Sequence, residues 1–160
     1  MKINLILSHQ KGAVMKSFLF FADNNWLLLI LRVTMGFVML PHGAQKMFGW
    51  FGGYGFSVTV NFFTETMRLP WLIAVLVILI EFFGAIGLIL GFGTRVCAMS
   101  FIVIMLGAIV TTNYHHGFFM NWFGNQQGEG FEYHLLVIGI CAALLISGGG
   151  DYSLDRLLHG

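Results

Sequence analysis

Charged residues are scarce in this sequence. It has 8 Lys and Arg and 7 Asp and Glu among 160 residues, or 9%. An ordinary soluble domain is about 25% charged, so the composition argues against a soluble globular fold, a disordered chain and a nucleic-acid-binding protein. The formal net charge is +1, which leaves no strong field to attract an anionic partner.

Cysteine is scarce as well. Cys97 and Cys141 lie in apolar runs and form no CxxC motif, so we interpret both as small buried apolar residues. The sequence has no Ser-His-Asp set, no bis-His haem spacing and no signal peptide with a small-residue cleavage site. His115 and His116 are adjacent, so their side chains diverge, and with His134 they make a poor metal site. We predict no metal and see no catalytic centre.

Apolar residues are abundant, at 58% of the chain, and the mean hydropathy is +0.83. A membrane-spanning helix needs about 20 mostly apolar residues. Four stretches qualify, at 26–48, 70–90, 94–114 and 131–149. We therefore predict an all-α integral membrane four-helix bundle over 26–158, preceded by a cytoplasmic or interfacial leader over 1–25. The last stretch is short, so we expect local thinning of the bilayer or tilt there.

The positions of Lys and Arg predict the orientation. With the N-terminus inside, six of the eight basic residues fall on the cytoplasmic side, and only Lys46 and Arg68 fall outside. Cytoplasmic loops are enriched in Lys and Arg. We therefore expect a multi-pass protein with both termini in the cytoplasm.

Four charged residues lie within or at the ends of the predicted spans, where charges usually face the bundle interior. Arg32 and Lys46 share one helical face with two glycines. Glu81 and Glu132 each lie on a face with small residues, which allow close helix packing in a membrane. We predict that these faces form a polar bundle centre with ion pairs Arg32–Glu81 and Lys46–Glu132. Alternatively, Arg32 and Lys46 snorkel to opposite interfaces.

Residues 48–63 carry many aromatic side chains separated by glycines. An aromatic belt at the membrane interface is the first interpretation. The alternative is a lid or a ligand pocket of the quinone type, because flat rings pack well against aromatic faces. Its candidate residues are His42 and Gln45, which follow Pro41, and Trp50 and Tyr54 in the loop. A simpler role for His42 and Gln45 is to satisfy the backbone carbonyls that Pro41 frees.

Several motifs occur in order along the chain. They are LPHGAQKMFGWFGGYG at 40–55, EFFGAIGLILGFGTR at 81–95, GFEYHLL at 130–136 and GGGDYSLD at 148–155, preceded by Arg32 and Gly36. Together they resemble the pattern of the DoxX family of small bacterial membrane proteins. The resemblance covers residues 27–157 and leaves 1–25 outside it.

This resemblance implies a four-helix protein of the bacterial inner membrane. Related DoxD-type proteins are subunits of thiosulfate:quinone oxidoreductases, so it also implies a redox-associated subunit that works with a quinone or a partner oxidoreductase. The expected partners are the lipid bilayer, a quinone, and a partner protein or second copy of the chain. Two alternatives stay open: a non-enzymatic scaffold or binding protein, and a small carrier or proton pathway that uses Glu81 and Glu132.

Overall fold

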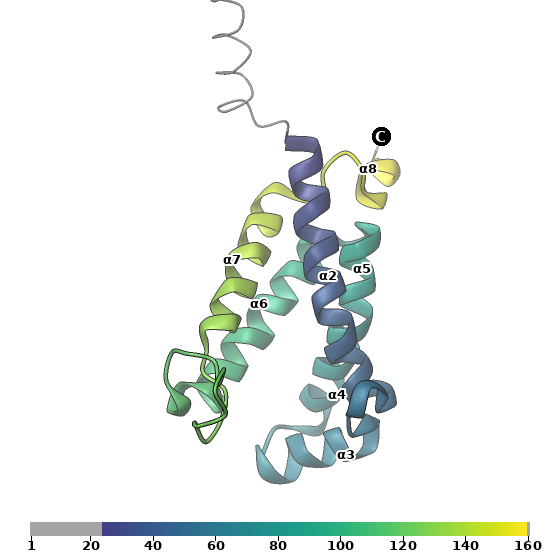
Figure 1. Ribbon diagram of the computed structural model, residues 1–160. Helices are drawn as coiled ribbons and strands as arrows, with labels where there is room; N and C mark the ends of the chain where they lie inside the picture. Colours follow the sequence, from purple (N-terminus) through teal and green to yellow (C-terminus); the bar gives the residue numbers. More distant parts are fainter. Residues whose placement is uncertain (1–23, 160) are drawn as a thin grey trace, which may run out of the picture.

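The computed structural model describes residues 24–159, which form a bundle of helices (Figure 1). Helix α2 (Asn24–Phe48) is the first long element. The second long segment runs without a break through α4 (Trp71–Leu79), η3 (Ile80–Gly84) and α5 (Ala85–Leu90). Helices α6 (Thr94–Thr111) and α7 (Glu132–Ser147) follow. The four predicted helical spans are confirmed. A tight turn joins α5 to α6.

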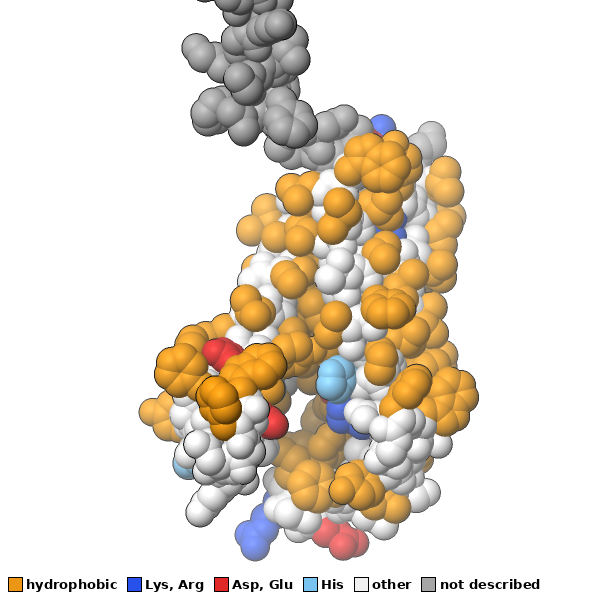
Figure 2. Space-filling view, viewed as in Figure 1, with side chains coloured by type: hydrophobic (Ala, Val, Ile, Leu, Met, Phe, Trp, Pro, Cys, Tyr) orange, Lys and Arg blue, Asp and Glu red, His pale blue; other side chains and the backbone are white. Residues whose placement is uncertain are grey.

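The bundle has the dimensions and surface of a membrane protein. Three segments, at 26–48, 71–90 and 94–111, are long and apolar enough to cross a bilayer. Helix α7 has 16 residues, which is about 24 Å of helix against a hydrocarbon core of about 30 Å. Exposed apolar side chains cover the flank of the bundle seen in Figure 2, as expected for a surface in contact with lipid.

The connections at one end of the bundle are long. Between α2 and α4 the chain forms η1 (Trp50–Gly52), α3 (Gly55–Asn61) and η2 (Phe62–Thr66). The connection from α6 to α7 begins with η4 (Asn113–His116). The short helices in the first connection were not predicted from the sequence.

The other end of the bundle holds both ends of the described chain. The segment after α7 turns back, and the chain finishes in α8 (Leu154–His159), close to the start of α2 (Figure 1). The leader predicted over 1–25 lies outside the described residues, except that Asn24 and Asn25 begin α2.

The core lies where α2 packs along η3 and α5 and where α6 packs along α7. Its main cluster consists of Met35, Met39, Ala85, Leu88, Ala98, Phe101, Met105, Val137, Cys141 and Leu144. The predicted inward faces of Arg32 and Glu81 are confirmed, because both residues are buried. The predicted inward face of α7 is wrong. Leu136 and Gly139, which share the side of Glu132, are exposed, and Val137 faces the core instead.

Candidate functional site

A buried ion pair joins α2 to the second long segment. Lys46 Nζ lies 2.5 Å from Glu81 Oε2. The Glu81 side chain is 6% exposed and the Lys46 side chain 28%, so the carboxylate is enclosed while the ammonium group borders more open space. Charges at such a position are expensive unless paired and commonly mark functional sites in membrane proteins.

Two features of the backbone bring these residues together. Glu81 lies in η3, a π-helical turn within the second long segment, and such turns occur frequently at functional sites. At Gly43, a Cβ atom would lie 2.6 Å from the backbone of Phe82, so α2 and η3 touch almost backbone to backbone. Lys46 follows Gly43 by three residues and therefore lies on the same face of α2.

The predicted pairing of the four charged residues is wrong. Lys46 pairs with Glu81, although the predicted partner of Glu81 was Arg32. Arg32 instead contacts Leu88 in α5, seven residues beyond Glu81. Seven residues correspond to about 10 Å along a helix. The predicted pairs rested on the helical faces of the charged residues, which do not reveal the close approach at Gly43.

Arg32 binds backbone carbonyls instead of Glu81. It is 1% exposed, and its guanidinium donates to the carbonyls of Leu88 and Ile89 at 3.3 and 2.6 Å. It also donates to the carbonyls of Gly149, at 3.1 Å, and Tyr152. Arg32 thus satisfies carbonyls at the C-terminal end of α5, where a cation is favourable, and fixes the segment after α7 in place.

Asp155 is a structural residue that the sequence interpretation missed. Its Oδ1 and Oδ2 accept the N–H groups of Gly93 and Thr94 at 2.7 and 2.9 Å, so it caps the start of α6. Its own N–H donates to the carbonyl of Gly91 at 2.9 Å. The GGGDYSLD motif contained the signal for this residue, because its last position, Asp155, is an acidic residue with no assigned partner.

Glu132, the first residue of α7, binds the connection between α6 and α7. Its Oε1 accepts the N–H of Met120 and the Nε1–H of Trp122, both at 3.0 Å. The predicted ion pair with Lys46 is therefore replaced by hydrogen bonds that fold this connection onto the start of α7.

A cavity of about 560 Å³ lies beside the ion pair, between α2 and the aromatic connection. It is lined by Gln45, Lys46, Gly52, Gly53, Tyr54, Val58, Thr59, Phe62 and Phe63. Figure 2 shows the molecule hollowed at this end, with a basic side chain and a histidine beside the opening. Within the described part of the chain, Lys46 is the one charged group in the lining.

The four predicted pocket residues separate into two pairs. Gln45 and Tyr54 line the cavity, and Gln45 Nε2 donates to the carbonyl of Phe51 at 3.2 Å. His42 faces Tyr133 of α7, with ring centroids 6.1 Å apart. Trp50 is 58% exposed and packs on Phe48 with ring centroids 5.0 Å apart, as in an aromatic belt.

The chemistry of this cavity is that of an amphipathic binding site. It offers an ammonium donor held by a buried carboxylate, an amide and a phenol, set in apolar and aromatic walls. Small-molecule sites commonly have this composition and volumes of roughly 300–1,000 Å³. Among residues 24–159, no group of three or more His, Cys, Asp or Glu side chains could hold a metal ion.

Comparison with known proteins agrees with this architecture. The sequence model of the DoxX family matches residues 27–114. The chain is 31% identical to inner membrane protein YphA of Escherichia coli (strain K12) over 145 residues, which cover 89% of this chain and 97% of that protein. It is 30% identical to inner membrane protein YqjF of the same organism, covering 82% and 92% of the two chains.

A third relative carries a functional name. The chain is 32% identical over 116 residues to putative oxidoreductase CatD of Bacillus subtilis (strain 168), covering 72% of this chain and 76% of that protein. No solved structure matches this chain significantly.

Proposed function

This chain belongs to the DoxX family, and on that premise we propose that it is a multi-pass inner-membrane subunit that binds a quinone for a partner oxidoreductase. The cavity beside Lys46 is the proposed quinone site. Two relatives are inner membrane proteins by name, and a third is named a putative oxidoreductase. These names support a membrane location and a redox-associated role.

The observation that carries the proposal is the buried ion pair at the cavity wall. Glu81 holds the Lys46 ammonium at 2.5 Å, and Lys46 lines the cavity. An ammonium group has three N–H donors, so Lys46 can bind Glu81 and still donate to a ligand. A fixed donor in a largely apolar pocket suits a ligand with carbonyl oxygens on an apolar body.

A quinone headgroup fits these residues. Its carbonyl oxygen would accept a hydrogen bond from Lys46, while Phe62 and Phe63 offer apolar contact to the flat ring. Reduction of a quinone to a quinol consumes two electrons and two protons. The partner oxidoreductase would supply the electrons and the adjoining water the two protons, and Lys46 would stabilise the negative charge that develops on the oxygen.

The test is a binding titration on the purified full-length chain in nanodiscs. A short-chain benzoquinone should quench tryptophan fluorescence saturably. Lys46→Met should weaken the binding by about tenfold or more, because a charged hydrogen bond is lost. Trp50→Phe should reduce the amplitude of quenching with little change in affinity, because Trp50 lies beside the cavity and outside its lining.

Arg68→Gln is the matched control. It removes one exposed cation at the same end of the bundle, outside the lining of the cavity, and should leave the affinity unchanged. Equal affinity in wild type and Lys46→Met, or quenching that never saturates, would refute the quinone site and favour the scaffold or carrier alternatives.

A further inference from the structure

A second cavity, of about 460 Å³, lies at the opposite end of the bundle from the proposed quinone site. Its walls come from the first turn of α6, the glycine segment after α7 and the start of α8. The residues that matter here are Thr94, Arg95, Ser147, Gly149, Ser153 and Arg156, all in its lining. The proposed function uses none of them.

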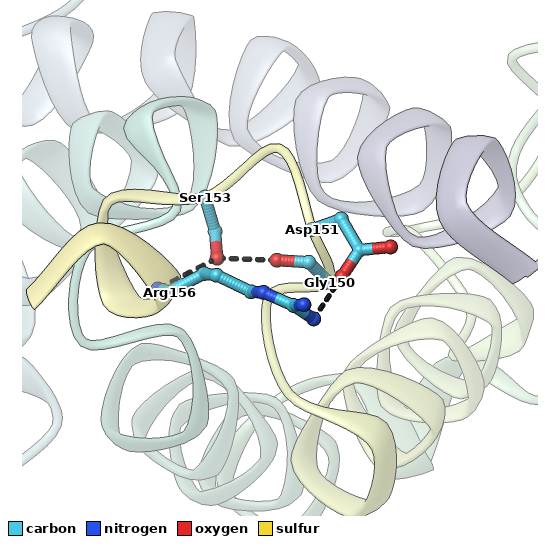
Figure 3. Close-up of polar contacts among 4 residues, drawn as sticks. All are labelled: Gly150, Asp151, Ser153 and Arg156. Carbon is cyan, nitrogen blue, oxygen red and sulfur yellow. Dashed lines mark hydrogen bonds and ion pairs between the residues drawn. The ribbon is translucent and has the colours of Figure 1, made fainter. Parts of the chain in front are cut away.

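Two guanidinium groups border this cavity. Arg95 Nη2 donates to the carbonyl of Ile146 at 3.2 Å. Arg156 pairs with Asp151, and its backbone N–H donates to Ser153 Oγ at 3.2 Å (Figure 3). A guanidinium has five N–H donors, and each of these side-chain contacts occupies one. Both arginines therefore have donors to offer a ligand.

One acidic residue, Asp155, also lines the cavity. Its two carboxylate oxygens bind the N–H groups of Gly93 and Thr94, so it is held against the start of α6. The ionised groups of the lining are then two cations and one anion.

A buried hydroxyl gives an independent indication of a ligand. Thr94 is fully buried, and its Oγ1 has no hydrogen-bond partner among the described residues. Buried hydroxyls nearly always have a partner. A Cβ atom at Gly149 would lie 2.8 Å from this oxygen and 2.8 Å from Ser153 Oγ, so Gly149 packs closely against both side chains. The site therefore lacks a hydrogen-bond acceptor.

We propose that this cavity binds a phosphate-type oxyanion, between Arg95 and Arg156 and above Thr94. Such an anion would accept hydrogen bonds from the planar guanidinium groups and from the Thr94 hydroxyl. Two sources carry this group, namely free phosphate and the headgroup of an anionic phospholipid. The ligand contributes to holding α6, α7 and α8 together.

The experiment uses the full-length chain with two separate probes. In detergent, inorganic phosphate is titrated at constant ionic strength set with chloride, and the unfolding temperature is followed. In nanodiscs, phosphatidylglycerol retained by the protein is measured by native mass spectrometry against phosphatidylcholine. A saturable rise in unfolding temperature with phosphate identifies a free oxyanion. Selective retention of phosphatidylglycerol without a phosphate response identifies a headgroup.

The variants link either response to this cavity. Arg95→Gln should weaken binding by about tenfold or more, and Arg156→Gln provides a second test because that side chain is 67% exposed and tolerates change. Thr94→Val keeps the shape of the side chain but removes the hydroxyl, so it should fold normally and bind more weakly. Arg68→Gln, which removes a cation outside this lining, should bind as wild type. No response to either probe, or equal responses in all four variants, would overturn the proposal.

Discussion

Lys46 and Glu81 lie in separate helices, yet their charged atoms are 2.5 Å apart within the bundle. The contact depends on a glycine one turn earlier in α2 and on a π-helical turn in the partner segment. Neither charge could be buried alone at low cost. The pair therefore fixes the register of the two segments and, in the same geometry, holds an ammonium group at a cavity wall.

The first prediction is that these two residues are energetically coupled. Glu81→Gln and Lys46→Met should each lower the free energy of unfolding by about 1–3 kcal/mol. This is below the roughly 3–5 kcal/mol found for fully buried pairs, because Lys46 is 28% exposed and can still reach water. The double mutant should show a coupling of about 0.5–3 kcal/mol, measured by unfolding in bicelles.

A parallel cycle with Arg32→Gln and Glu81→Gln serves as the control. Arg32 binds carbonyls of Leu88 and Ile89 and not the carboxylate, so the two effects should add within about 0.5 kcal/mol. Coupling in this cycle and additivity in the other would restore the pairing of Arg32 with Glu81.

The second prediction concerns the close approach of α2 to η3. In Gly43→Ala, the new methyl group would lie 2.6 Å from the backbone of Phe82. The helices must then separate, which should cost about 1–3 kcal/mol and weaken the Lys46–Glu81 contact. Gly139→Ala is the matched control, because a Cβ there meets nothing within 4 Å. Equal thermal stability of the two variants would contradict the packing.

Hydropathy and the period of the helix were enough to predict the four spans and the inward faces of Arg32 and Glu81. They failed for α7, where Gly139 suggested helix contact but is exposed. In a membrane both sides of a helix are apolar, so small residues alone do not identify the buried side.

The polar contacts were harder to predict, for two physical reasons. Arg32 can be satisfied by carbonyls as well as by a carboxylate, and the sequence does not display which carbonyls lie unpaired. Two of the carbonyls that Arg32 binds, those of Gly149 and Tyr152, also lie in the segment after α7. No contact was predicted for that segment. The GGGDYSLD motif draws attention to its acidic residues, but the contact of Asp155 with the start of α6 depends on tertiary folding.

The third prediction tests whether Arg32 holds the segment after α7 against the end of α5. Arg32→Lys keeps the charge but loses the planar fork that reaches carbonyls on two segments. It should lower the free energy of unfolding by roughly 1.5–3 kcal/mol and speed hydrogen exchange in residues 148–155. Arg68→Lys is the control, since Arg68 is exposed and lies toward the other end of the bundle. Unchanged exchange at 148–155 would show that Arg32 does not hold this segment.

The fourth prediction tests the cap on α6. Asp155→Ala removes both acceptors from the N–H groups of Gly93 and Thr94 and should cost about 0.5–2 kcal/mol. Asp155→Asn keeps one acceptor oxygen and should fall between the alanine variant and wild type. Thermal unfolding with equal midpoints for wild type and Asp155→Ala would refute the capping role.

The last prediction concerns orientation in the membrane. The start of α2 and helix α8 lie at one end of the bundle (Figure 1), which also holds Arg32, Arg95 and Arg156, while Lys46 and Arg68 lie toward the other end. Because Lys and Arg accumulate on the cytoplasmic side, the end with α8 should be cytoplasmic. A reporter active only in the periplasm should give no signal when fused after Gly160 and a strong signal when inserted after Gly124, in the connection between α6 and α7. The reverse pattern would invert the orientation, and with it the side of the membrane from which each cavity is reached.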